Sequence, residues 1–222
     1  GSVSFTNLSN ISITDGRFRD KYPTAADSDN NTGTDDIPAE EYGVVEVLFS
    51  NGAADQLSTL NGTTDFYSIE VKKGTSQTFI AEFNASSTAN FRLLGRIAMD
   101  QSDDSGTTPN IDNHRALGLE AGILKLGDNI VIDQISKEDE NGSDPSTQGG
   151  NRNYIIDLDA QLWLASNSII TRSNDWGIHP FGRLKVSDDA TLTFTGTGQR
   201  TILIDNQGVF EMTGGTVNVT QF

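Results

Sequence analysis

The sequence predicts an all-β protein whose main body is a right-handed parallel β-helix (β-solenoid) with acidic loop insertions. Three observations lead to this prediction. Short segments of alternating apolar and polar residues, typical of strands, run through most of the chain. Gly, Ser, Thr, Asn and Asp separate these segments, and such residues favour turns over long helices. In the second half, one strand motif recurs at variable spacing.

The first half divides into a polar N-terminal region and the beginning of the body. Residues 1–41 contain one alternating piece followed by an acidic stretch, and we expect an N-terminal strand with an acidic linker or cap. Residues 42–222 are predicted to form the body. Turns such as Asn51-Gly52 separate its strands, because Asn-Gly accepts positive φ at little cost. For this first half a β-sandwich is the alternative, since it also uses short alternating strands.

Two segments interrupt the body, at about residues 100–114 and 136–153. Both are acidic, contain glycine and have almost no large apolar residues. We therefore expect them to be loops that leave a regular framework. The strand pattern continues to the last residues, so we expect the chain to be a fragment of a longer protein.

The clearest repeat is a small residue followed by two large apolar residues at alternate positions and then by turn residues. Four segments align in this way without gaps, namely residues 122–129, 160–167, 190–197 and 208–215. The small residue recurs after 38, 30 and 18 positions, which suits a solenoid whose turns can lengthen freely. The alignment predicts one inward column of Leu124, Leu162, Leu192 and Phe210, and a second of Leu126, Leu164, Phe194 and Met212.

The stretch Gly208-Val-Phe-Glu-Met-Thr-Gly-Gly-Thr-Val-Asn-Val resembles the coils of bacterial β-helix surface adhesins and passenger-type domains. It also resembles repeats of phage tail fibres and tailspikes. The resemblance covers about residues 117–222. It implies a non-enzymatic stalk or adhesive module, secreted and held at the cell surface, whose partners are surface glycans or a host or neighbouring cell. A phage fibre or tailspike segment is the alternative, and the oligomeric state stays open.

The charge of the chain limits the classes of molecule that it can bind. The net charge is −16, from 31 acidic and 15 basic residues. Such a chain repels the phosphates of nucleic acids, which need Lys and Arg for neutralisation. No stretch approaches the ~20 apolar residues of a membrane span. The chain has no cysteine, which excludes disulfides and thiolate metal sites.

Clustered carboxylates make calcium the expected cofactor. Alternating Asp and Asn residues in a polar loop present the oxygen ligands that this hard cation prefers. The match to an EF-hand loop is incomplete, because Thr32 stands where that loop has glycine. A solvated acidic loop is the alternative at each cluster. The predicted metal ligands are Asp27, Asp29, Asn31, Asp35, Asp103 and Asp104.

Two tryptophans are the predicted ligand-binding residues. Trp163 lies between two inward leucines and should therefore point outward, in a column with Lys125, Thr193 and Glu211. An exposed indole offers a large contact area to a sugar or a protein partner. Trp176 lies in a nearby loop and would add to this surface. The alternative is that an insertion covers Trp163 and that Trp176 closes a loop onto the body.

We predict no catalytic residue and no enzymatic activity. The sequence contains no phosphate-binding loop, no nucleophile elbow and no cysteine. The alternative is a polysaccharide lyase or glycoside hydrolase, since β-helix folds host such enzymes. Asp157 and Asp159 would then be its carboxylate pair, because two residues apart on one strand places side chains on one face, about 7 Å apart.

Overall fold

The computed structural model contains only β-strands and the turns that join them, within the residues it describes. These residues are 2–5, 10–14, 16–18, 46–50, 52, 54–66, 68–93, 117–132, 154–172, 178–194, 202–204 and 207–219. The predicted all-β class is confirmed. In these ranges no helix is long and apolar enough to cross a membrane. Both predicted insertions, at 100–114 and 136–153, lie outside the described residues.

The strands recur in groups of three along the chain. The first three groups are β1 (Ser2–Phe5), β2 (Ile11–Ile13) and β3 (Gly16–Phe18); β4 (Glu46–Ser50), β5 (Gln56–Leu60) and β6 (Thr64–Phe66); and β7 (Ser68–Lys72), β8 (Ile80–Ala85) and β9 (Phe91–Leu93). In the fourth group, one long strand, β10 (Leu117–Leu126), takes the place of the first two strands, and β11 (Val131–Ile132) follows.

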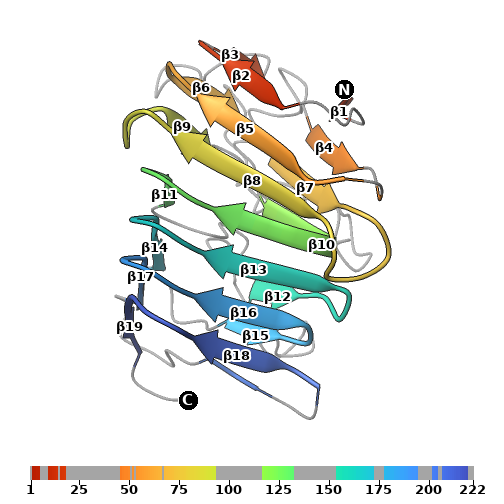
Figure 1. Cartoon of the computed structure of the whole chain (residues 1–222), viewed down its shortest axis with the longest axis vertical. Helices are drawn as coiled ribbons and strands as arrows, with labels where there is room; N and C mark the ends of the chain where they lie inside the picture. Colours follow the sequence, from red (N-terminus) through yellow and green to blue (C-terminus); the bar gives the residue numbers. More distant parts are fainter. Residues whose placement is uncertain are drawn as a thin grey trace, which may run out of the picture.

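The last three groups keep the same order. They are β12 (Tyr154–Ile156), β13 (Ala160–Leu164) and β14 (Ile169–Arg172); β15 (Ile178–Pro180), β16 (Arg183–Val186) and β17 (Thr191–Phe194); and a bridge residue, Ile202, with β18 (Val209–Met212) and β19 (Thr216–Asn218). Corresponding strands of successive groups lie side by side along the long axis of the molecule (Figure 1).

Every strand pair among the described residues is parallel. The central row, formed by β2, β5, β8, the second half of β10, β13, β16 and β18, runs through the whole stack. A first row, β1, β4, β7 and the first half of β10, flanks it on one side. The β-sandwich alternative does not agree with this pairing, because the sheets of a sandwich are antiparallel.

The remaining strands make the third side of each group. They form two sheets, with the strand orders β3-β6-β9 and β11-β14-β17-β19, in which each strand pairs with its neighbours in the order. In the second half β12 pairs with β15, on the side that the first row occupies in the earlier groups. Each group thus contributes a strand, half of the long strand β10 or the bridge residue Ile202 to each side, and the next group repeats the arrangement.

Inward side chains of the central row form two apolar columns, as predicted, but with different members. In the second half of the chain the columns are Leu124, Leu162, Leu184 and Phe210, and Leu126, Leu164, Val186 and Met212. Leu192 and Phe194 were wrongly placed in these columns. Both lie on β17, where Leu192 is in register with Ile170 and Val217. The error arose because the same strand motif occurs both in the central row and on the third side. The ungapped alignment of the repeat therefore matched β17, a strand of the third side, to strands of the central row.

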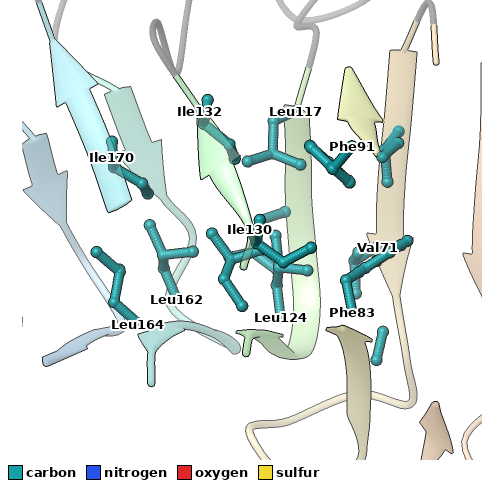
Figure 2. Packing of buried hydrophobic residues seen from close by; sticks show 14 of the residues in the cluster. Val71, Phe83, Phe91, Leu117, Leu124, Ile130, Ile132, Leu162, Leu164 and Ile170 are labelled. Carbon is teal, nitrogen blue, oxygen red and sulfur yellow. The ribbon is translucent and has the colours of Figure 1, made fainter. Parts of the chain in front are cut away.

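The three sides enclose one core. The Phe83 ring on β8 makes edge contacts with Phe49 on β4, Phe66 on β6 and Phe91 on β9, at centroid distances of 4.9, 6.1 and 5.7 Å. Figure 2 shows that this packing continues along the stack, where Leu124, Ile130 and Leu162 belong to the same buried cluster as Phe83 and Phe91. The interior is therefore filled with side chains and continuous from one group to the next.

Small residues occupy the corner before each strand of the central row. The register aligns Gly122 with Ala160, and Gly182 and Gly208 hold the equivalent positions before β16 and β18. A Cβ atom at Gly182 would lie 2.1 Å from the Ala160 carbonyl oxygen, so this corner admits no larger residue. The prediction of small residues at strand entry is confirmed, although Ala190 precedes β17 on the third side and not a strand of the central row.

Turns between the central row and the third side depend on positive φ. Asn129, Ser166 and Asp188 have φ of 57°, 51° and 54°, a region that Asn and Asp tolerate better than most residues. The Asn129 backbone N–H donates to Asn167 Oδ1 at 2.7 Å, and Asn167 Nδ2 donates to Asn129 Oδ1 at 3.0 Å. These bonds join one turn to the next and help to fix the register of the stack.

Candidate functional site

Of the predicted site residues, only Trp163 belongs to the described part of the chain. It lies on β13 in the central row and is half-buried, with its side chain on the outer face. Trp176 lies outside the described residues. So do the predicted metal ligands Asp27, Asp29, Asn31, Asp35, Asp103 and Asp104. Within the described ranges no three His, Cys, Asp or Glu side chains gather as a metal site would require.

The register places Trp163 in the middle of an outward column. Its members, one from each of β8, β10, β13, β16 and β18, are Glu82, Lys125, Trp163, Lys185 and Glu211. We call this set the Trp163 column. Lys125 and Glu211 lie in it as predicted. Lys185 takes the place predicted for Thr193, which is on β17 with Leu192 and was misplaced for the same reason.

Two ammonium groups approach the indole from neighbouring strands. Lys125 Nζ lies 4.8 Å and Lys185 Nζ 4.6 Å from the centroid of the Trp163 ring. Because β10 and β16 flank β13 on opposite sides, the two cations come from opposite directions. Both distances are within the ~6 Å range of cation–π attraction. The ring is thus held between two positive charges.

Carboxylates complete the column at both ends. Lys125 Nζ lies 3.2 Å from Glu82 Oε1, and Lys185 Nζ lies 3.0 Å from Glu211 Oε1. Glu211 also accepts a hydrogen bond from Arg183, which lies diagonally across the β16–β18 pair. Hydrogen bonds from Lys185 and Arg183 hold the pKa of Glu211 below its usual value. The column therefore has its two cations beside the indole and its two carboxylates at the ends, and it is neutral overall, although the whole chain carries −16.

The polar edge of the indole is bonded to the adjoining turn. Trp163 Nε1 donates to Ser187 Oγ at 2.8 Å, and Ser187 Oγ donates to Asp188 Oδ2 at 2.9 Å. The backbone N–H of Ser166 also donates to Asp188 Oδ2, at 3.2 Å. These donors, first the Ser166 amide and then the Ser187 hydroxyl, lower the pKa of Asp188. The carboxylate thus ties the turn after β16 to the turn after β13.

This geometry limits what the Trp163 column can do. Its cations contact the indole and its indole N–H is used, so the ring is less available for flat stacking of a sugar than an isolated surface tryptophan would be. The groups on the outer face are the half-buried indole and the ammonium and carboxylate groups around it. They can donate and accept hydrogen bonds to a polar partner. No nucleophile–base pair is formed by these residues.

We expect the Trp163 column to stabilise the fold. Trp163→Ala should lower the free energy of unfolding by about 2–3 kcal/mol, because the ring area, two cation–π contacts and one hydrogen bond are lost. Trp163→Phe keeps the ring but not the N–H, and should cost about 1 kcal/mol. Urea denaturation of the three proteins measures this order. A Trp163→Ala variant as stable as the parent would show that the column has no structural role.

The buried amine of Lys73 is a second unusual group. Lys73 follows β7, its side chain is fully buried, and its Nζ has no hydrogen-bond partner within the described structure. Burial lowers its pKa, and the nearby Asp55 carboxylate opposes this effect only in part. A charged amine without a partner is costly in an apolar interior. We therefore expect the charged Lys73 amine to destabilise the folded state at neutral pH.

Lys73→Met should raise the free energy of unfolding by about 1–3 kcal/mol at neutral pH. The pH dependence gives a sharper test. In the unfolded chain the amine titrates near 10.5, and in the folded chain it titrates lower. Between the two values the unfolded state binds more protons, so the stability of the parent rises with pH in this window. The Met variant should lack this rise in urea-denaturation curves.

A neighbouring lysine supplies the matched control. Lys72 is exposed and pairs with Glu120, whose hydrogen bond raises the Lys72 pKa. Lys72→Met should change the stability by less than about 1 kcal/mol, since exposed ion pairs contribute little. If both Met variants had the same stability and the same pH profile, Lys73 would not be the destabilising group inferred above.

The carboxylate pair of the enzymatic alternative does not share a strand. Asp157 and Asp159 lie in the turn between β12 and β13, and Asp159 is exposed. Their backbone carbonyls accept hydrogen bonds from Ala160 and Gly122 at 2.9 and 3.0 Å. The prediction that both side chains project from one strand face was therefore wrong. In the sequence, the apolar Leu158 continues the alternation of β12 past Ile156. It is 53 % exposed and lies in the turn that follows the strand.

Comparison of the chain with protein-family models, with curated proteins and with solved structures gave no match.

Proposed function

We propose that the chain is a right-handed parallel β-helix and serves as a non-enzymatic segment of a secreted bacterial cell-surface protein, as a stalk or adhesive module. The observation that carries this proposal is the in-register parallel pairing of corresponding strands, which the central row repeats from β2 to β18. Each group of strands then forms one coil. A single coil cannot bury its own apolar residues, so stability requires stacking along one direction, and an elongated body results.

The side chains support a mechanical role over a catalytic one. The interior is filled by apolar columns, and the outer face of the central row carries ion pairs that join successive coils. Hydrogen bonds between turns, such as those of Asn129 and Asn167, also join successive coils. All of these contacts resist separation of one coil from the next. That is the property a surface stalk requires.

We further propose that the outer face of the central row contacts surface glycans. The Trp163 column offers a half-buried indole together with ammonium and carboxylate groups, which can bond to sugar hydroxyls. Calcium is the proposed cofactor, bound by the acidic clusters around Asp27 and Asp103. A high density of carboxylates supports this, because calcium prefers oxygen ligands.

Analytical ultracentrifugation combined with thermal melting, in EDTA and in millimolar calcium, tests the proposal. We expect an elongated particle, and a melting temperature that calcium raises by several degrees, since a ligand that binds only the folded state stabilises it. A compact particle would contradict the stalk. An elongated trimer without any calcium effect would favour the phage-fibre alternative, and depolymerisation of a polysaccharide would favour the enzymatic one.

A further inference from the structure

The turn that joins β5 to β6 begins with Asn61, which is exposed. The next residue is Gly62, and among the described asparagines no other precedes a glycine. Neither residue has a positive φ, so this turn does not depend on the left-handed conformation that glycine favours. The consequence of the glycine is chemical, because the peptide nitrogen that follows Asn61 has no neighbouring Cβ atom.

An asparagine side chain can react with the peptide nitrogen of the following residue. The deprotonated nitrogen attacks Cγ, a new C–N bond forms, and the side-chain nitrogen takes up a proton and leaves as ammonia. The product is a cyclic imide, which water opens at either carbonyl carbon. One opening gives aspartate. The other gives isoaspartate, in which the main chain runs through the former side chain, and both products carry a carboxylate in place of the neutral amide.

The structure leaves both reacting groups available. Among the described residues no acceptor is bonded to the Gly62 N–H, so no hydrogen bond has to break before the nitrogen loses its proton. The missing side chain lets this nitrogen come close to Cγ of Asn61. Within the same residues the Asn61 amide makes one hydrogen bond, from Nδ2 to Ser12 Oγ at 3.0 Å. Because Asn61 is exposed, water and hydroxide can reach it.

Asn167, in the turn between β13 and β14, shows the opposite situation. It is exposed like Asn61, but the next peptide N–H, that of Ser168, donates to the Ala165 carbonyl oxygen at 3.1 Å. Both polar atoms of the Asn167 amide are also bonded to Asn129, at 2.7 and 3.0 Å. The side chain of Ser168 further crowds the attacking nitrogen. The fold thus protects Asn167 from the reaction and leaves Asn61 open to it.

We propose that Asn61 is a site of spontaneous deamidation, which converts it to aspartate and isoaspartate while the chain is folded. Hydroxide removes the proton of the Gly62 amide, and water is the only other co-reactant. Ammonia is released, and the chain gains one further negative charge. The proposal concerns the chemistry of this turn and does not depend on the proposed function, so either can fail without the other.

The two products should differ in their effect on the contact between the first two groups of strands. The Asn61 N–H donates to the Ile13 carbonyl oxygen on β2 at 2.6 Å, and the Asn61 amide donates to Ser12 on the same strand. In the aspartate product the Ser12 hydroxyl can donate to the new carboxylate, which preserves the contact. In the isoaspartate product the longer main chain displaces the turn from β2. We therefore expect only the isoaspartate form to melt below the parent.

Incubation of the folded full chain at neutral and at mildly alkaline pH, followed by peptide mapping with tandem mass spectrometry, tests the proposal. We expect Asn61 to convert at least about tenfold faster than Asn167, because the nitrogen after Asn61 is unhindered and unbonded. The rate should rise with pH, since the attacking nitrogen must lose its proton. In urea the protection of Asn167 is lost, and its rate should increase. An Asn61 that reacts no faster than Asn167 in the folded chain would overturn the proposal.

Variants of the turn separate the proposed chemistry from other causes. Gly62→Ala keeps the asparagine and should slow its conversion by at least about tenfold, because the new Cβ crowds the nitrogen. Thr63→Ala, at the exposed position that follows, is the control and should react like the parent. If Gly62→Ala melts below the parent, Asn61→Gln takes its place, since its longer side chain closes the imide ring far more slowly. Conversion at the parent rate in Gly62→Ala or Asn61→Gln would contradict the proposal.

Discussion

Leu192→Asp should unfold the protein. Leu192 on β17 is fully buried and lies in one inward column with Ile170 and Val217. The substitution removes a buried isobutyl group and places a carboxylate without a partner in an apolar interior. We expect a loss of at least about 4 kcal/mol, which is a large part of the typical stability of a domain. Far-UV circular dichroism and thermal melting measure the effect.

The control for this substitution lies on the same strand. Thr193 is half-buried on the outer face of β17 and accepts a hydrogen bond from Asn218 Nδ2 at 3.0 Å. Thr193→Asp keeps an acceptor at this position and should change the stability by less than about 1 kcal/mol. If Leu192→Asp melted within about one degree of the parent, Leu192 could not lie in the interior. The substitution thus tests the assignment of inward and outward faces on the third side.

The burial of Leu192 was predictable, whereas its partners were not. Alternation along residues 191–194 decides which side chains face inward, because a strand has a period of two. Alternation does not decide to which side of a coil the strand belongs. The correct central segment, Gly182-Arg-Leu-Lys-Val, also fits the repeat motif and lies 22 residues after Ala160 and 26 before Gly208. The nearly even spacing is the signal that identifies it.

Burial of Lys73 follows from the same periodicity. Ile69 and Val71 point inward on β7, and continuing the alternation by two positions places Lys73 inward as well. The charge of the side chain argues for exposure, and the backbone pattern overrides it here. The Trp163 column could be predicted in part for the same reason. The outward direction of the Trp163 side chain follows from the position of this residue between two leucines. The contact between Trp163 and Lys185 could not be predicted without the register of β16.

Gly122→Ala has the second largest expected effect, because Gly122 lies at the bend of β10 between the first and the central row. Its φ is +86°, a conformation that L-residues with a side chain rarely adopt. A Cβ atom would also lie 2.7 Å from both Cβ and the carbonyl oxygen of Lys73. The backbone cannot easily move away, since the Gly122 amide donates to Asp159 and the Ile123 amide donates to Phe79. We expect a loss of about 2–4 kcal/mol in urea denaturation.

Gly118→Ala on the same strand is the matched control. Gly118 lies four residues earlier, its φ is not positive, and an added Cβ would first meet the flexible side chain of Glu70 at 3.3 Å. Alanine there should be neutral within about 1 kcal/mol, because it also restricts the unfolded chain. The difference between the two variants isolates the bend from the general cost of replacing glycine in a strand. Equal losses would mean that β10 does not turn at Gly122, and the continuity between the first and the central row would need another explanation.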